Sequence, residues 1–162
     1  MARQDFVLAP CVPEDVEEMI DINLRAFKDD YFGNFTFPDA KIAPDERRRW
    51  MRARILRTMA KPENRNFKVT EVSTGRIGAW ARWYFPYRFS AEEKAERERE
   101  EQDKEKARAE GTLQEWPLGA NVEACDAKFG ELGRLMKKHV DLEDMYGKYF
   151  HSPEVPPAQE DR

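Results

Sequence analysis

The sequence predicts a single domain of the mixed α/β (α+β) class. Two segments, residues 16–27 and 45–60, place apolar residues at the three- and four-residue spacing of a helix. A third segment, residues 67–85, repeats its apolar residues at period two, as a β-hairpin does. We expect the order N-terminal strand, two helices, β-hairpin, charged insertion, third helix and short terminal strand. A chain of 162 residues is long enough for one hydrophobic core.

Composition excludes several classes of protein. The net charge is −4, from 28 Lys and Arg against 32 Asp and Glu, so no strong attraction to nucleic acid or to an anionic membrane is expected. No window approaches ~18 consecutive apolar residues, and the N-terminus lacks the apolar run of a signal peptide. The two cysteines, Cys11 and Cys125, lie far apart, which favours a reducing compartment. We expect a soluble, cytoplasmic protein.

The first elements are a short strand, Phe6 to Leu8, and a helix after Pro13. Proline suits the first helical position, and the acidic Glu14 and Asp15 interact favourably with the helix dipole. An apolar stripe follows at helical spacing: Val16, Met19, Ile20, Leu24 and Phe27.

A loop of residues 28–44 is expected next, and it is rich in aromatic residues. Tyr31, Phe32, Phe35 and Phe37 show no regular periodicity there. Such a loop either packs on the core of its own domain or borders a ligand. The sequence leaves both readings open.

The second helix is expected from about Asp45 to Ala60. Its inward face carries Met51, Ile55, Leu56 and Met59. The other side carries a basic cluster: Arg47, Arg48, Arg49, Arg52, Arg54, Arg57 and Lys61. This side is either a solvated face or a surface for an anionic ligand, and the glycine-rich setting of a phosphate cradle is missing.

A hairpin follows, with Gly75 at the turn because glycine tolerates positive φ. The second strand, Arg76 to Phe85, also carries Trp80 and Tyr84 on the face opposite its main apolar row. We therefore expect this strand to be covered on both faces and central in a larger sheet.

The charged insertion, residues 90–111, has alanine as its only apolar residue type up to the final glycine. Pairs such as Glu93 with Arg97 and Glu100 with Lys104 support a solvated helix. A flexible linker is the alternative, because no apolar positions recur for a coiled-coil partner.

The third helix is expected to begin after Asn121, a favourable N-cap residue. Its apolar stripe consists of Val122, Cys125, Phe129, Leu132, Met136 and Val140. Cys125 lies on this stripe, so we expect it to be a packing residue. His139 and His151 are isolated, so no metal site is expected, and the catalytic residues are unknown.

Three segments of the chain share a pattern with a known family: "FVLAPCVPEDVEEMIDINLRAF", "FKVTEVSTGRIGAWARWYF" and "EWPLGANVEACDAKFGEL". Together they resemble the N-terminal half of a fungal-type acetyltransferase of the GNAT superfamily. The most specific block is Trp116-Pro117 followed by Gly119-Ala120-Asn121. The resemblance implies a partial GNAT-like domain over residues 1–146, followed by a divergent Pro-rich tail, residues 147–162, that we expect to be disordered.

The resemblance also implies acetyl-CoA as cofactor in the family, with direct attack of an amine on the thioester. In the family, a loop of pattern Gln/Arg-x-x-Gly-x-Gly/Ala opens a helix whose amides hold the pyrophosphate. The string from Arg108 to Leu113 matches this pattern only by chance, so no cofactor-binding residue is identified. The chain therefore reads as an incomplete, truncated GNAT-like fold.

The family's first helix-to-helix loop borders the acceptor pocket. The resemblance thus implies substrate-side candidates in this loop: Asp29, Asp30, Tyr31, Phe35 and Phe37. The acceptor would be a small-molecule or peptide amine. The alternative is a non-catalytic remnant or protein-interaction module that uses an exposed sheet edge or the charged helix.

A missing neighbour strand has a physical consequence. The strand from Arg76 to Phe85 would leave its ladder groups and apolar faces exposed. We therefore expect self-association, a partner strand, or marginal stability of the isolated chain.

Overall fold

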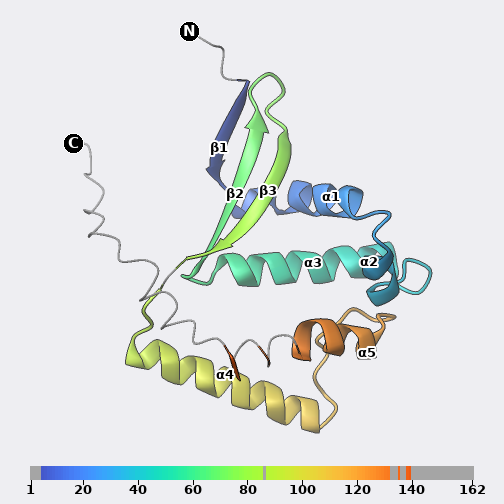
Figure 1. Cartoon of the computed structure of the whole chain (residues 1–162), viewed down its shortest axis with the longest axis vertical. Coiled ribbons are helices and arrows are strands. Elements are labelled where there is room, and N and C mark those ends of the chain that lie inside the picture. The colour runs from blue at the N-terminus through green and yellow to red at the C-terminus, as the bar shows by residue number, and fades with distance from the viewer. Residues whose placement is uncertain (1–4, 86, 132–134, 136–137, 140–162) are drawn as a thin grey trace.

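The computed structural model describes residues 5–85, 87–131, 135 and 138–139 (Figure 1). Within these residues the chain is mixed α+β, with five α-helices and one three-stranded antiparallel sheet. The predicted fold class is therefore confirmed at this level. The expected terminal strand after Tyr146 and the tail of residues 147–162 lie outside the described residues.

The sheet is built from β1 (Phe6–Pro10), β2 (Asn64–Glu71) and β3 (Ile77–Tyr84), in that spatial order. Both pairs are antiparallel. The hairpin turn is at Gly75, whose φ of 70° is the left-handed conformation that glycine adopts without strain. The predicted hairpin and its turn are confirmed.

The prediction that the second hairpin strand, β3, is central in the sheet is wrong for the described residues. There β2 is central and β3 lies at an edge. A β-bulge explains the misleading pattern. Val69 pairs with Ala79 while Thr70 pairs with Ile77, so Gly78 is the extra residue. The bulge reverses the alternation of side chains, and Ile77 and Trp80 then face the same side.

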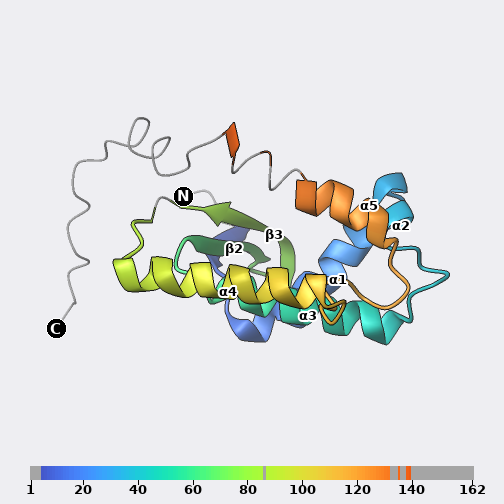
Figure 2. The same cartoon turned by 90° about the horizontal axis from the view of Figure 1, so that it is seen from below.

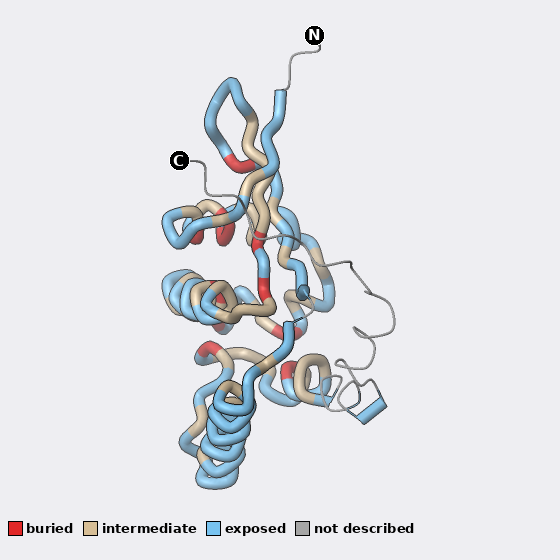
Figure 3. Tube along the Cα trace, turned by 90° about the vertical axis from the view of Figure 1, so that its left-hand side faces the viewer, coloured by how far each residue is buried: buried red, intermediate tan, exposed pale blue. Residues whose placement is uncertain are grey.

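Helices cover one face of the sheet. A 3-10 turn (Pro13–Asp15) leads into α1 (Val16–Ala26), and α3 (Pro44–Met59) runs beside it (Figure 1). The main core cluster consists of Val16, Met19, Ile20 and Ile55. Buried residues gather where these helices meet the strands (Figure 3).

Trp80 joins β3 to this core. Its indole Nε1 donates a hydrogen bond to the carbonyl oxygen of Met19, at 2.9 Å. Lys68 of β2 faces the same side, where its Nζ lies 2.6 Å from a carboxylate oxygen of Asp15. The helix-covered face of the sheet therefore combines apolar packing with polar ties.

The charged insertion forms α4 (Ala91–Ala109), a helix with no buried residue. Ser90 and Glu93 make reciprocal capping bonds at its start. Salt bridges tie its two ends, with 2.6 Å between Arg97 and Glu63 and 2.9 Å between Arg108 and Glu115. The helix lies below α3 in Figure 1, and it lies in front of α3 in the view from below (Figure 2).

The region of the third predicted helix begins at Asn121, whose Oδ1 accepts the N–H of Ala124. The structure has a short α5 (Val122–Cys125) that continues as a π-helical segment (Asp126–Glu131), so one uninterrupted α-helix is not what forms here. Leu132, Met136 and Val140 lie outside the described residues.

No helix in the described part of the chain combines the length and the apolar character needed to cross a membrane.

Candidate functional site

The predicted loop of residues 28–44 contains a short helix, α2 (Tyr31–Thr36), which corrects the expectation of an irregular segment. Asp30 is its N-cap, and its Oδ2 accepts the N–H of Gly33 at 2.8 Å. The Asp30 carboxylate thus caps the N-terminus of α2. Its neighbour Asp29 is exposed.

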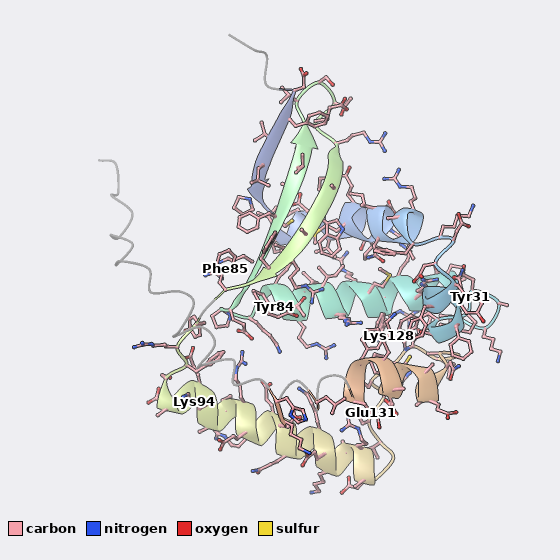
Figure 4. The ribbon with its side chains drawn as sticks, in the orientation of Figure 1. Tyr31, Tyr84, Phe85, Lys94, Lys128 and Glu131 are labelled. Atoms are coloured by element: carbon pink, nitrogen blue, oxygen red, sulfur yellow. The ribbon has the colours of Figure 1, made fainter. Side chains whose placement is uncertain are left out.

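The other substrate-side candidates face different surroundings. Tyr31 is 83% exposed and Phe35 is exposed on the same short helix. Tyr31 lies at one end of α3, far from Tyr84 and Phe85 at the other end (Figure 4). Phe37, in contrast, points into the molecule. The structure therefore does not bring the five predicted residues together as one site.

Phe37 belongs to an aromatic cluster formed with Trp50, Trp116 and Phe129. Its ring centroid lies 5.1 Å from that of Trp50 and 6.3 Å from that of Phe129. The Trp50 indole also donates to the carbonyl oxygen of Glu115. Phe37 therefore packs against aromatic side chains of its own domain, which is one of the two possibilities expected for the loop.

Arg54 lies against this cluster without an ion-paired carboxylate among the described residues. Its Cζ is 5.1 Å from the Trp50 ring centroid and 5.2 Å from that of Phe129. Burial lowers the pKa of Arg54, and the positive charges of Arg82 and Arg57 lower it further. The helix-covered side of β3 therefore carries an excess of positive charge.

Several arginines of the α3 basic cluster are held by carboxylates and are not free for a ligand. Arg48 bridges Glu17 (2.9 Å) and Asp21 (2.6 Å) of α1, and Arg52 also pairs with Glu17. These bonds lower the pKa of Glu17, Arg48 contributing first and Arg52 next. One part of the basic cluster thus joins α3 to α1, and the other part is solvated.

Among the described residues, the edge of β3 is the feature that most clearly offers unpaired backbone groups. The backbone N–H of Phe85 donates to the carbonyl oxygen of Glu63 at 2.8 Å. Antiparallel ladders alternate between hydrogen-bonded and non-hydrogen-bonded pairs. Counting back from Phe85, the odd-numbered residues of the strand bond to β2. The backbone N–H and C=O groups of Trp80, Arg82 and Tyr84 therefore point away from the sheet.

The other end of this edge is closed. The N–H of Ile77 donates to a carboxylate oxygen of Glu18 at 2.9 Å. As far as the described strands and helices extend, the open part of the edge therefore runs from Trp80 to Tyr84, which we call the free edge. Tyr84 is 61% exposed at its end.

The free edge was missed from the sequence because this strand was predicted to be central in the sheet. One residue of the strand nevertheless indicates an edge position. Arg82 sits in the middle of an apolar strand and lies on the helix-covered side, next to the charge of Arg54. Inward-pointing charged residues are one way in which natural proteins mark an edge strand.

A hollow of about 320 Å³ lies between α1 and the hairpin turn. Its lining carries charges of both signs, from Glu18, Asp21, Arg25, Lys28 and Arg76, together with the apolar Leu24. None of the substrate-side candidates lines it. The hollow brings together no nucleophile with a base, so its geometry does not favour a particular reaction.

The cysteines are poor nucleophiles in this setting. Burial raises the pKa of Cys125 to about 11, with a further contribution from Asp126, and burial also raises the pKa of Cys11. Within the residues that the structure describes, no group of three His, Cys, Asp or Glu side chains could hold a metal ion.

The string from Arg108 to Leu113 lies at the C-terminal end of α4, where Gly111 has a φ of 68°. It closes a helix and does not open one. Its backbone amides therefore do not form the helix N-terminus that holds a pyrophosphate.

Comparison with known proteins identified no matching family model, no similar curated protein and no similar solved structure.

Proposed function

We propose that this chain is a protein-interaction module that binds an extended segment of a partner protein along the free edge of β3. The observation that carries the proposal is the outward direction of the backbone groups of Trp80, Arg82 and Tyr84. In strand addition, such groups supply main-chain hydrogen bonds, while pockets for alternate side chains give specificity. The neighbouring α4 is held at its ends and does not pair with this edge.

The surroundings of the edge define the chemistry of the segment. Arg82 faces the helix-covered side, beside Arg54, so an acidic residue of the segment is favoured there. Trp83 is 60% exposed on the opposite face and favours an apolar neighbour. We infer an extended segment that alternates apolar with polar or acidic residues.

The test uses peptides selected from a random library on the immobilised full-length chain. The proposal expects them to protect the amides of Trp80, Arg82 and Tyr84 from hydrogen exchange. Arg82→Pro removes the outward N–H and is expected to weaken binding at least tenfold. Arg82→Ala is the matched control, because it removes the same side chain but keeps the N–H. If selected peptides protect none of the three amides, or bind Arg82→Pro as well as Arg82→Ala, the proposal is wrong.

Descent from a GNAT acetyltransferase is a second proposal. It is supported by the strand and helix at the start of the chain and by the hairpin, because the segments that carry the resemblance fold as these elements. Acetyl transfer to a small-molecule or peptide amine would require a site for the cofactor's pyrophosphate.

The three longest described helices do not fit that group. The first turn of α1 carries Glu17 and Glu18, and that of α4 carries Glu92 and Glu93. The first turn of α3 is likewise acidic. Carboxylates at a helix N-terminus repel an anionic diphosphate and occupy the favourable end of the dipole. No catalytic step is therefore derived for acetyl-CoA.

Isothermal titration calorimetry of the full-length chain with acetyl-CoA separates descent from activity. The interaction-module proposal expects no binding heat at millimolar ligand. Saturable binding of acetyl-CoA, followed by acetylation of an added amine, would support acetyltransferase activity. It would contradict the conclusion that the three longest described helices do not fit the pyrophosphate.

A further inference from the structure

The face of the sheet opposite α1 and α3 is apolar and has no cover among the described residues. Asn64 and Lys68 of β2 bond to α3 and to Asp15, so the odd-numbered residues of β2 face the other way. Residues opposite one another in the register share this side. We call it the open face, and its large apolar members are Phe6, Leu8, Phe67, Val69, Trp83 and Phe85.

The apolar patch of the open face approaches the size of a standard protein–protein interface. Phe6 is 54% exposed, Leu8 68% and Phe85 43%, and Trp83 is the largest exposed member. With the partly exposed Phe67 and Val69, the patch amounts to roughly 600 Å² or more, since a buried aromatic side chain contributes about 150–250 Å². A standard interface buries about 800 Å² on each partner.

The same face carries two opposite charges, one near each end of β2. Arg65 lies three residues before Lys68 and Glu71 lies three residues after it, and both belong to the odd-numbered set. The guanidinium of Arg65 donates to the carbonyl oxygens of Pro62 and Asn64, and Glu71 accepts from the Thr74 hydroxyl. Neither makes an ion pair with a described residue.

We propose that the open face is the interface of a homodimer, in which two copies pack sheet on sheet about a two-fold axis near Lys68. An interface of this symmetry must be self-complementary. With the two β2 strands antiparallel, Arg65 of each copy lies over Glu71 of the other, and Phe67 and Val69 of the two copies meet between these pairs. The charge pattern of the face therefore matches a second copy of this chain.

The distances agree with known sheet packing. Each of the two charged residues lies about 10 Å from the axis, because a strand rises ~3.3 Å per residue. Two aligned sheets cross at about 30° with about 10 Å between them, which displaces the facing ends sideways by only about 5 Å. An arginine and a glutamate side chain together can span this separation.

The test begins with the oligomeric state of the full-length chain by sedimentation velocity, at about 100 μM, where a dimer of micromolar Kd predominates. The proposal expects a dimer. Arg65→Glu and Glu71→Arg each create two like-charge contacts across the axis and are expected to weaken dimerisation at least tenfold. Glu98→Arg on α4 is the control for a charge reversal of equal size, and it is expected to dimerise like the native chain.

Mixing the two weakened variants separates lost contact from lost folding. In a heterodimer of Arg65→Glu with Glu71→Arg, both facing pairs again carry opposite charges. The mixture is therefore expected to dimerise while each variant alone is monomeric. A misfolded variant would not be rescued by its partner.

A conservative variant gives a second, independent measurement. Arg65→Lys keeps the charge and supplies an amine, so a zero-length carbodiimide is expected to join Lys at position 65 to Glu71 of the other copy. The same link within one copy is excluded, because the two residues lie ~20 Å apart along one strand. Mass spectrometry of the linked peptide identifies it.

The proposal is overturned if the native chain is monomeric under these conditions, if the mixture does not dimerise, or if no such cross-link forms. It is also overturned if Arg82→Pro abolishes dimerisation while the charge reversals do not, because the copies would then pair through the free edge. Dimerisation that survives Arg82→Pro, together with loss of peptide binding in that variant, would support both proposals separately.

Discussion

The backbone N–H of Phe85 donates to the carbonyl oxygen of Glu63 across 2.8 Å, and this bond fixes the phase of the ladder between β2 and β3. All backbone groups that β3 offers to a partner follow from it, because the direction of the peptide groups alternates along a strand. At the other end, the Glu18 carboxylate takes the N–H of Ile77. The free edge is therefore short and has defined limits.

Gly119→Ala is expected to destabilise the fold by about 2–4 kcal/mol. Gly119 has a φ of 94°, and a Cβ there would lie 2.2 Å from the carbonyl oxygen of Lys41. Two residues later, the N–H of Asn121 donates to the carbonyl oxygen of Thr36, so the chain is held against the same region. Urea denaturation followed by tryptophan fluorescence measures the loss.

The control for this change is Gly111→Ala. Gly111 also has a positive φ, but no atom lies within 4 Å of its added Cβ. Only backbone strain applies there, so a loss of about 1 kcal/mol is expected. Equal effects of the two substitutions would show that the Lys41 carbonyl does not approach Gly119 as described.

Trp80→Phe is expected to cost about 1–3 kcal/mol of unfolding free energy. The substitution removes the indole hydrogen bond to Met19 and leaves a gap beside the core of α1. Thermal unfolding monitored by circular dichroism gives the value. The matched change Trp83→Phe, on the open face, should cost less than about 0.5 kcal/mol in the monomer. A reversed order would contradict the assignment of the two faces.

The attachment of α4 is expected to weaken in acid. Burial alone would raise the pKa of Glu63, but the hydrogen bond from Arg97, together with a backbone bond, more than offsets it, so the pKa is lowered. A carboxylate with a lowered folded-state pKa contributes stability above its ordinary pKa of about 4.3, and this stability is lost as the pH falls through the folded-state pKa. The protection of the amides of residues 91–100, corrected for the pH dependence of intrinsic hydrogen exchange, should therefore fall in that range.

Glu63→Gln separates this effect from other carboxylates near α4, such as Glu93, whose pKa is lowered mainly by the backbone N–H of Ser90. In the variant, α4 should exchange faster at neutral pH and lose the part of the pH dependence that belongs to Glu63. A profile identical to that of the native chain would show that the Arg97 salt bridge does not anchor the helix.

The elements with strong periodicity were predictable from sequence. The apolar stripe beginning at Val16 and the inward face around Ile55 identified α1 and α3, because a regular repeat reports which side of a helix is buried. The hairpin followed from its alternation and from Gly75. These elements are held mainly by contacts that the local pattern already encodes.

The elements that depend on single residues were missed. The six residues of α2 are too few to show a helical repeat, and only Asp30 marked the start. The position of β3 was misread because the bulge at Gly78 moves Ile77 and Trp80 to one side, which imitates a strand with two buried faces. The grouping of Phe37 with Trp50, Trp116 and Phe129 depends on tertiary packing that joins distant segments.

Amide hydrogen exchange along β3 of the full-length native chain, resolved by NMR, tests the free edge most directly. The amides of Ala79, Ala81 and Trp83, which bond to β2, should be strongly protected, whereas those of Trp80, Arg82 and Tyr84 should exchange much faster. Uniform protection of both sets, or protection of the second set alone, would show that this edge is already paired, and the proposed docking of a partner segment would be wrong.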